Sequence, residues 1–311
     1  MRVAAVDIGT NTVRLLLATA VRQEEAFQLR DPQRHEVITK LGEGLDSSGV
    51  LAAAPMQRAL DGLAHYADLI REGRVAVRGG VATAATRSAA NGEEFADRVG
   101  KTLGFHPRVI DGVEEARLTF LGATSTLDAN AAYCVIDVGG GSTEFVCGHE
   151  HPESAASIDI GSVRLTERIV ALGLRDPGDI RAYVDDLFAG VAPPVSPSLV
   201  LGSGGTYVTL AAVARHVLPQ AIEAHGEVVL SFDELQTTVD RLLGMTVEQV
   251  ALLPEVPAAR AEVLQAGAIC AERAVARIGA AAVRISVSDI LDGLAMEMAA
   301  QEWPEAEAPG R

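Results

Sequence analysis

One pattern occurs twice in this sequence: an apolar strand-like run that contains an aspartate, a loop of glycine and small polar residues, and a second strand-like run. Seven positions separate Asp7 from Arg14, the first charged residue of the returning run. The same seven positions separate Asp137 from Glu144. A duplicated strand–loop–strand unit predicts two related lobes. The two copies are VDIGTNTVRLL at 6–16 and IDVGGGSTEFV at 136–146.

Strand-like and helix-like segments alternate along the remaining sequence. Apolar residues recur at helical spacing over 53–72, which predicts an amphipathic helix. Asn91 is placed to cap a helix whose first turn contains Glu93 and Glu94. The alternation predicts an α/β architecture with mixed sheets. The expected strands lie at 2–7, 13–20, 35–42, 75–83, 108–110, 132–138, 142–148, 196–202 and 282–287.

The length of 311 residues fits two domains. We place the boundary near 124–130, where GATSTLDAN interrupts the pattern. The first lobe is then expected over 1–125 and the second over 126–300, with a last helix that can pack back on the first lobe. The tail at 301–311 is expected to fray.

Charge and cysteine content exclude several classes of protein. The net charge of −16 disfavours nucleic acid as a partner. The chain has neither an uncharged apolar run of membrane-spanning length nor the build of a secretory signal, so we expect a cytoplasmic protein. Cys134, Cys147 and Cys270 have no metal-binding spacing, and we expect neither a disulfide framework nor a zinc site. Cys134 and Cys147 are expected to be packing residues, opposite each other in the core.

Three glycine-rich loops have the composition of anion-binding loops. They are GTNT at 9–12, GGGST at 139–143 and GSGGT at 202–206. Their backbone N–H groups can point together at an anion, and small side chains allow it to approach closely. None matches the dinucleotide-binding or P-loop motifs. A single such loop is a common hairpin turn, but three in one chain favour a phosphate ligand.

The two acids of the second repeat predict a metal site. If the strands at 133–138 and 143–148 form a hairpin, Asp137 and Glu144 face each other with Cβ atoms about 5 Å apart. Two carboxylates this close repel each other unless a cation lies between them. Carboxylate and phosphate oxygens suit Mg²⁺, and Asp7 could reach the same ion. The alternative is that both acids cap turns in solvent.

Two glutamates lie at the start of a helix expected from about Val113. Acids in a first turn interact favourably with the helix dipole, which explains one of them without a function. On a helical wheel, Glu114 lies at the edge of the apolar side that includes Val113, whereas Glu115 points away from it, beside Thr119 and Gly122. The polar side can face a cleft between the lobes, where a carboxylate can orient a water and accept its proton. We therefore favour Glu115 over Glu114.

Two arginines are candidates for binding phosphate. Arg87 follows a strand end in the small-residue stretch TAATRSAAN, and Arg14 follows the first glycine loop. An arginine can hold a phosphate through two hydrogen bonds. A surface ion pair is the alternative for each.

Together these motifs resemble the Ppx/GppA family of exopolyphosphatases and guanosine pentaphosphate phosphohydrolases. The resemblance covers roughly residues 3–295 and depends on eight motifs in order. It implies two ribonuclease-H-like lobes of the actin-like superfamily with a cleft between them. The motifs are VDIGTNTVRLL, TAATRSAAN, DGVEEARLTFLG, VIDVGGGSTEF, SIDIGSVRLTE, LGSGGT, RAEVLQAGA and VSDILDG.

The resemblance also implies a role for each matching position. Glu115, with Glu114 adjacent, corresponds to the base that activates water. Asp137 and Glu144, with Asp7 helping, correspond to the ligands of Mg²⁺ or another divalent cation. The implied phosphate contacts of the first lobe are Gly9, Thr10, Asn11, Thr12, Arg14 and Arg87. Those of the second lobe are Gly139, Gly140, Gly141, Ser142, Thr143, Gly204, Gly205 and Thr206.

The implied activity is release of terminal orthophosphate from inorganic polyphosphate. Guanosine pentaphosphate is an alternative substrate for the same residues, and a sensor that binds without hydrolysis is a second alternative. A sugar-kinase-like phosphotransferase is disfavoured, because the EEA motif supplies an acid that activates water. Longer family members carry a helical module with a His-Asp signature, which this chain lacks, so it resembles the short two-domain branch. A homodimer is implied by the resemblance alone.

Overall fold

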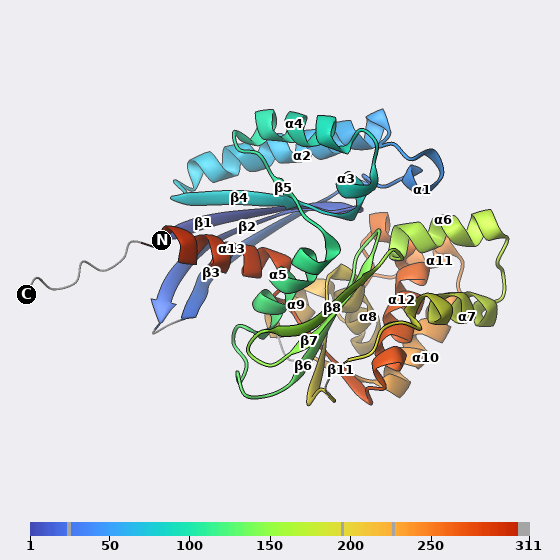
Figure 1. The fold of residues 1–311 in the computed structure, drawn as a ribbon. Coiled ribbons are helices and arrows are strands. Elements are labelled where there is room, and N and C mark those ends of the chain that lie inside the picture. The colour runs from blue at the N-terminus through green and yellow to red at the C-terminus, as the bar shows by residue number, and fades with distance from the viewer. Residues whose placement is uncertain (24–25, 194–195, 226–227, 304–311) are drawn as a thin grey trace, which may run out of the picture.

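A computed structural model describes residues 1–23, 26–193, 196–225 and 228–303 of the chain. Within these residues the strands form two sheets, one in the upper and one in the lower half of Figure 1. The first contains Arg2–Ile8 (β1), Thr12–Gln23 (β2), Ala26–Ile38 (β3), Val77–Ala82 (β4) and Arg108–Val109 (β5), in the order β3-β2-β1-β4-β5. The second contains Tyr133–Val138 (β6), Thr143–Gly148 (β7), Pro152–Ile158 (β8), Leu199–Ser203 (β9), Val229–Ser231 (β10) and Ala282–Ile285 (β11), in the order β10-β11-β9-β6-β7-β8.

The two sheets share one topology. In the first, β2 is antiparallel to both β1 and β3, and β4 is parallel to both β1 and β5. In the second, β7 is antiparallel to β6 and β8, and β9 is parallel to β6 and β11. Only β10, an added edge strand, has no counterpart among the described strands of the first sheet. The predicted duplication and the α/β fold with two ribonuclease-H-like lobes are therefore confirmed.

Helices cover the faces of both sheets (Figure 1). Helices α2 and α13 contact the first sheet, α4 packs against α2 and joins the same apolar core, and α8 and α12 contact the second sheet. The helices are Leu45–Ser48 (α1), Ala53–Glu72 (α2), Ala84–Ser88 (α3), Gly92–Leu103 (α4), Gly112–Thr124 (α5), Ser162–Leu172 (α6), Pro177–Phe188 (α7), Gly205–Arg215 (α8), Pro219–His225 (α9), Phe232–Leu243 (α10), Val247–Ala251 (α11), Ala261–Ile278 (α12) and Ile290–Glu302 (α13).

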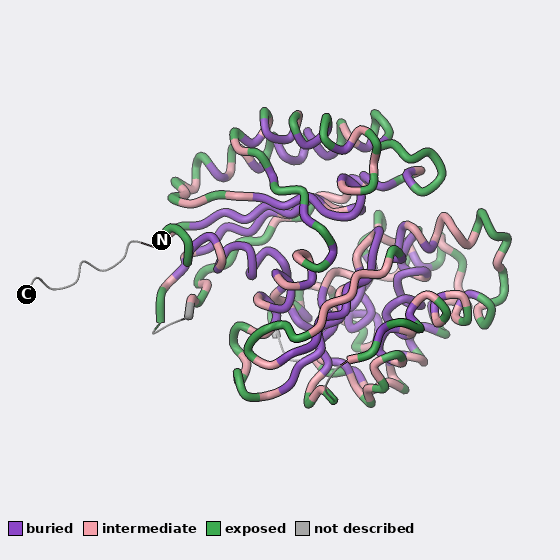
Figure 2. The backbone as a smooth tube through the Cα atoms, in the orientation of Figure 1, coloured by how far each residue is buried: buried purple, intermediate pink, exposed green. Residues whose placement is uncertain are grey.

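The first sheet has an apolar core on each of its faces. On one face Leu63 and Tyr66 of α2 pack against strand residues such as Leu15, and the Tyr66 hydroxyl donates to the Val13 carbonyl at 3.0 Å. On the other face α13 covers the sheet with residues such as Leu294. Figure 2 shows the buried strands between these helices. Each large apolar side chain buried in this way stabilises the fold by about 1.5–3 kcal/mol.

Helix α5 lies between the two lobes and packs against both. Ala116 and Phe120 pack with Val146 of the second sheet, whereas Leu118 belongs to the core under the first sheet. Its remaining side crosses α13 so closely that a Cβ atom on Gly122 would lie 2.0 Å from the Asp289 carbonyl oxygen. A packed helix between the lobes fixes the position of every residue that it carries.

This arrangement corrects the expected orientation of α5. The side with Thr119 and Gly122 was expected to face a cleft, but both residues are buried, and Gly122 packs against α13. Val113, expected on the apolar side, is 56% exposed. A helical wheel takes no account of a helix from a distant part of the sequence. Here α13 covers the side of α5 that contains Gly122.

Several local predictions are refined by the structure. The helix predicted over 53–72 has these bounds, but β3 begins at Ala26 and not at His35, because an exposed edge strand needs no apolar alternation. Asn91 occupies the N-cap position of α4, yet its side chain accepts a hydrogen bond from the Leu51 amide at 2.8 Å and caps nothing. Strands β8 and β10 have no counterpart among the expected strands. Of the tail expected to fray, 304–311 lie outside the described residues, and α13 extends to Glu302.

Cys134 and Cys147 form a disulfide, which corrects their expected role as packing residues only. Their predicted pairing across β6 and β7 is confirmed, and it brings their Cα atoms to 4.1 Å from each other. Cys270 is free and buried. Among the described residues, no helix is both long enough and apolar enough to cross a bilayer. The lobe boundary at residue 125 remains a prediction.

The crossing of α5 and α13 predicts a sensitive position. Replacing Gly122 with alanine places a methyl group 2.0 Å from a backbone oxygen, so one of the helices must move. We expect the free energy of unfolding to fall by about 3 kcal/mol, at the upper end of overpacking effects. Gly190→Ala is the control, since no atom lies within 4 Å of the added methyl. Equal stability of the two variants in urea denaturation would show that the helices do not cross in this way.

Candidate active site

The two repeats form matching hairpins, and the second has the predicted register. Asp7 on β1 pairs with Arg14 on β2, and Asp137 on β6 pairs with Glu144 on β7. The loops between the strands close with the same hydrogen bond. The Gly9 amide donates to the Thr12 carbonyl at 2.9 Å, and the Gly139 amide donates to the Ser142 carbonyl at 3.0 Å. Both glycine loops therefore return as strands, as the sequence predicted.

Both hairpin loops line one small cavity between the lobes, of about 70 Å³. The third glycine loop, at the start of α8, lines it too. Most of the predicted site residues are thus brought together, and those that line the cavity are Asp7, Gly9, Thr10, Asn11, Thr12, Arg14, Glu115, Asp137, Gly139, Gly140, Gly141, Ser142, Gly204, Gly205 and Thr206. The predicted residues outside this lining are Arg87, Glu114, Thr143 and Glu144.

Glycine is needed where the loops meet. A Cβ atom on Gly140 would lie 2.9 Å from the Thr10 Cβ, and one on Gly141 would lie 2.7 Å from the Thr10 hydroxyl. Gly204 has a φ of 87° and lies beside Asp137, whose Oδ1 would be 2.6 Å from an added Cβ. Larger residues would fill the space in which backbone amides can reach a small anion.

The structure separates the two glutamates of α5. Glu114 accepts hydrogen bonds from Arg117 Nε at 2.7 Å and Nη2 at 2.8 Å, and Arg108 lies beside it. These hydrogen bonds lower its pKa, and its side chain is 29% exposed away from the cavity. Glu115 lines the cavity, and its side chain is only 12% exposed. Of the two, Glu115 alone is placed to meet a ligand between the lobes.

Arg87 lies beside Glu115, although it does not line the cavity. Its Nη1 donates to the Ile110 carbonyl at 2.8 Å and lies 3.4 Å from Glu115 Oε2. The guanidinium is thus fixed at the end of α3 by the residue that follows β5 and leads into α5. Both contacts use Nη1, and no hydrogen bond of the other guanidinium N–H groups is found in the described part of the chain. These groups can therefore donate to an anion.

The acids around the cavity are held out of water. Burial raises the pKa of Asp137 to about 7 and that of Glu144 to about 8, where the charge of Asp137 adds to the effect. Burial also raises the pKa of Glu115 well above its ordinary value, and the nearby carboxylates of Glu144, Asp7 and Asp137 reinforce it against the opposing Arg87. A site with these raised values can exchange protons near neutral pH.

Arg14 is held by two carboxylates. Its Nη2 lies 2.6 Å from Asp7 Oδ2, and its Nη1 pairs with Asp289 at the start of α13. Burial alone would raise the pKa of Asp289, but Arg14 and Arg34 outweigh it and lower that pKa. A phosphate that binds Arg14 must therefore displace one of these carboxylates or share the guanidinium with it. The predicted contact between Arg14 and phosphate remains a prediction.

Asp289 was missed as a site residue in the sequence. The signal available was the motif VSDILDG, which the resemblance includes but to which no role was given. Asp289 caps α13 by accepting from the Leu291 amide at 2.9 Å, and the same side chain reaches Arg14. An acid that caps a helix is an ordinary feature, so the sequence did not reveal its second contact.

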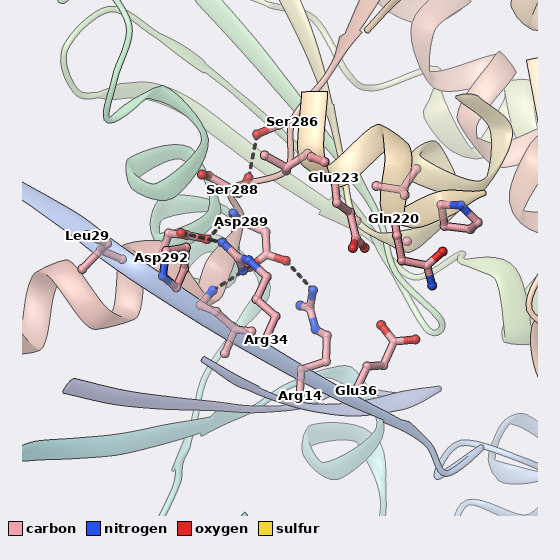
Figure 3. Close-up of a pocket in the computed structure, with 18 of the residues that line it drawn as sticks. Arg14, Leu29, Arg34, Glu36, Gln220, Glu223, Ser286, Ser288, Asp289 and Asp292 are labelled. Carbon is pink, nitrogen blue, oxygen red and sulfur yellow. Dashed lines mark hydrogen bonds and ion pairs between the residues drawn. The ribbon is translucent and has the colours of Figure 1, made fainter. Parts of the chain in front are cut away.

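Arg14 lines both the small cavity and a larger one of about 820 Å³. Figure 3 shows residues that line the larger cavity. Arg14, Arg34 and Glu36 reach it from the first sheet, and Glu223 reaches it from α9. Arg34 pairs with Asp292 at 2.7 Å on the side formed by α13. This cavity has walls of mixed polarity and room for a group much larger than one phosphate.

The remaining predicted residues lie behind the cavity lining. Thr143 donates its hydroxyl to the Ile160 carbonyl at 2.7 Å, which is a contact within the lobe. Glu144 is 1% exposed, and Ser157 donates to its Oε1 at 2.7 Å. Thr206 lines the cavity, but its hydroxyl donates to the Val138 carbonyl at 3.2 Å.

The acids of the site are suited to a divalent cation, because carboxylate oxygens are hard ligands and two of these oxygens have no hydrogen-bond partner. Asp7 Oδ1 and Glu144 Oε2 are buried without a hydrogen-bond partner. In the described part of the chain, no group of three or more Asp, Glu, His or Cys side chains is arranged to hold a metal ion by itself. Mg²⁺ commonly takes only one or two protein carboxylates and completes its shell with phosphate oxygens and water. The residues therefore fit an ion that binds together with a phosphate ligand.

Comparison with known proteins identifies relatives over almost the whole chain. The model of the Ppx/GppA phosphatase family matches residues 20–302. Exopolyphosphatase 2 of Mycobacterium tuberculosis is 36% identical over 315 residues, which cover 96% of this chain and 98% of that protein. The crystal structure of an exopolyphosphatase-like protein has a TM-score of 0.84 at 31% identity and covers 95% of this chain and 97% of its own. The Ppx/GppA member from Aquifex aeolicus has a TM-score of 0.78 at 28% identity, with coverage of 98% and 99%.

The raised pKa values predict how stability depends on pH. Between about pH 4 and pH 8, the folded protein keeps protons on Asp137 and Glu144 that the unfolded chain has released. The free energy of unfolding should therefore fall as pH rises through this range, by at least about 2 kcal/mol between pH 5 and pH 8. Urea denaturation with a chelator present measures it.

Two variants test the source of this dependence. Asp137→Asn and Glu144→Gln should each flatten the slope of unfolding free energy against pH, because the replaced group no longer titrates. Glu94→Gln, on an exposed position of α4, should leave the slope unchanged. If the free energy of unfolding still falls steeply with pH in the double variant Asp137→Asn, Glu144→Gln, the dependence comes from other titratable groups.

Proposed function

The chain belongs to the Ppx/GppA phosphatase family, and we propose that it is an exopolyphosphatase, which releases terminal orthophosphate from inorganic polyphosphate. The full-length similarity to a named exopolyphosphatase supports this activity. The observation that carries the mechanism is the position of Glu115. It is a nearly buried carboxylate in the same small cavity as all three glycine loops.

Glu115 is proposed as the base that activates water. A water molecule held by its carboxylate attacks the terminal phosphorus, the bond to the bridging oxygen breaks, and the proton of the water passes to Glu115. Burial keeps the pKa of Glu115 high, which suits a group that must accept a proton. The buried position also limits the access of other water molecules to the reacting phosphate.

The terminal phosphate is proposed to lie between the hairpin loops. Backbone amides of both loops and the loop before α8 can donate to its oxygens, and Arg87 can approach from the side of Glu115. Fixed donors of this kind stabilise charge that develops in the transition state without needing to reorganise. Asp7, Asp137 and Glu144 are the proposed ligands of a divalent cation, with Mg²⁺ as the first candidate. When bound, the cation would neutralise charge on the phosphate oxygens.

Guanosine pentaphosphate is a second candidate substrate. The cavity of about 820 Å³ that shares Arg14 with the small cavity favours it, since a nucleoside needs such a volume. The same residues would then cleave a different terminal phosphate. A cytoplasmic location is also proposed, and a homodimer is proposed from the resemblance alone. The net charge of −16 supports the expectation that nucleic acid is not a partner.

The role of Glu115 predicts a specific loss of activity. Glu115→Gln keeps the shape of the side chain but cannot accept the proton, so kcat for phosphate release should fall 10²–10⁴-fold with little change in KM. Glu114→Gln is the matched control on the next position of α5 and should retain kcat within a few-fold. Steady-state kinetics with short polyphosphate measures both. Unchanged kcat in Glu115→Gln would remove it from the mechanism.

The substrate is tested by parallel assays of phosphate release. The wild-type protein is given short polyphosphate, long polyphosphate, guanosine pentaphosphate and ATP, each with Mg²⁺ and with chelator. We expect metal-dependent release from polyphosphate. Release from guanosine pentaphosphate alone would select the second candidate, and tight binding of polyphosphate without release of phosphate would indicate a sensor.

A further inference from the structure

We propose that Ser157 is a positioning residue for the cation site, which acts by fixing the carboxylate of Glu144. The inference depends on the proposed function, because it assigns Glu144 to the cation. Ser157 lies on β8, outside the glycine loops and outside the cavity lining. Its contacts join the two elements that carry Glu144 and Glu115.

The first contact is a hydrogen bond to Glu144. The two residues are register partners on β7 and β8, and the Ser157 hydroxyl donates to Glu144 Oε1 at 2.7 Å. The other oxygen, Oε2, is buried without a partner. One oxygen of the carboxylate is thus anchored, while the other makes no hydrogen bond of its own. The Ser142 hydroxyl is the further group beside this carboxylate, and both serines lower its pKa.

The second contact is with the start of α5. A Cβ atom on Gly112 would lie 2.2 Å from the Ser157 Cβ and 2.3 Å from its Oγ, so only glycine leaves room for this serine. Gly112 is the first residue of α5, three positions before Glu115. Ser157 is therefore confined between the helix and the strand, which restricts the directions in which its hydroxyl can point.

These contacts give Ser157 a function that packing alone does not require. A carboxylate rotates easily about its last torsion unless a hydrogen bond holds it. The hydroxyl holds Glu144 in one orientation, and the packing of α5 holds the hydroxyl. Partners of this kind orient metal ligands in many proteins, and their loss typically lowers metal affinity or activity 10–100-fold.

The test measures cation binding directly. Mn²⁺ replaces Mg²⁺ as a spectroscopic probe, and orthophosphate is added because the ion is expected to bind together with phosphate. Electron paramagnetic resonance then gives the affinity of the whole protein for Mn²⁺ without turnover. Ser157→Ala should weaken Mn²⁺ binding about 10-fold. Ser154→Ala is the matched control, a half-buried serine on the same strand whose register partner is Cys147. It should bind Mn²⁺ as the wild type does.

A double-mutant cycle separates positioning from general damage. If Ser157 acts through Glu144, Ser157→Ala should have no further effect on Mn²⁺ affinity in a Glu144→Gln background. Thermal unfolding of both serine variants checks that the fold is kept. Additive effects of Ser157→Ala and Glu144→Gln would overturn the inference, as would unchanged Mn²⁺ affinity in Ser157→Ala.

Failure of the inference is distinguishable from failure of the proposed function. Phosphate release by the wild-type protein tests the function by itself. If the wild-type protein releases phosphate but Ser157→Ala does not change the affinity for Mn²⁺, the inference is overturned and the proposed function stands. Absence of Mn²⁺ binding by the wild type overturns it too, because Glu144 would then hold no cation for Ser157 to position.

Discussion

The removal of four carboxylates from water is the interaction on which the rest of this site depends. Asp7, Glu115 and Asp137 line the small cavity between the lobes and Glu144 lies behind its lining, and burial raises the pKa of each. For Asp137 the change from its ordinary value to about 7 corresponds to roughly 4 kcal/mol. A fold can maintain such an arrangement only with a well-packed frame around it. The two sheets and the helix between them form that frame.

The duplicated hairpins are alike in backbone but not in charge. Their loops close with the same hydrogen bond, and their strands pair in the same register. In the first hairpin the residue opposite the aspartate is Arg14, which neutralises Asp7 within the lobe. In the second it is Glu144, which adds a further negative charge. The second lobe therefore has the deficit of positive charge that a cation can balance.

Features that depend on neighbours in sequence were predictable. The helix at 53–72, the register of the second hairpin and the duplicated architecture follow from periodicity and from the spacing of Asp137 and Glu144. Glu115, which we favoured over Glu114 as the base, lines the cavity, although Gly122 on the same side of α5 packs against α13. Its role as the base stays a prediction.

Features that depend on distant contacts were not predictable. Arg14 and Asp289 are 275 positions apart, and no local pattern signals that they pair. The same limit explains why β3 and β8 were misjudged, because edge strands are partly solvated and carry weak alternation. The disulfide was missed for another reason: the register showed that Cys134 and Cys147 are opposite each other, but three cysteines without a spacing motif did not indicate a bond.

The position of α13 has a consequence for how the protein is made. This helix follows the whole second lobe in the sequence, yet it covers one apolar face of the first sheet, where Ile290 and Leu294 pack with Val3 and Leu16. Domains generally fold in order as they leave the ribosome. Here the first sheet emerges early and stays uncovered on that face until the second lobe has been synthesised. The nascent chain therefore presents an apolar surface for most of translation, and chaperones are the natural means to shield it.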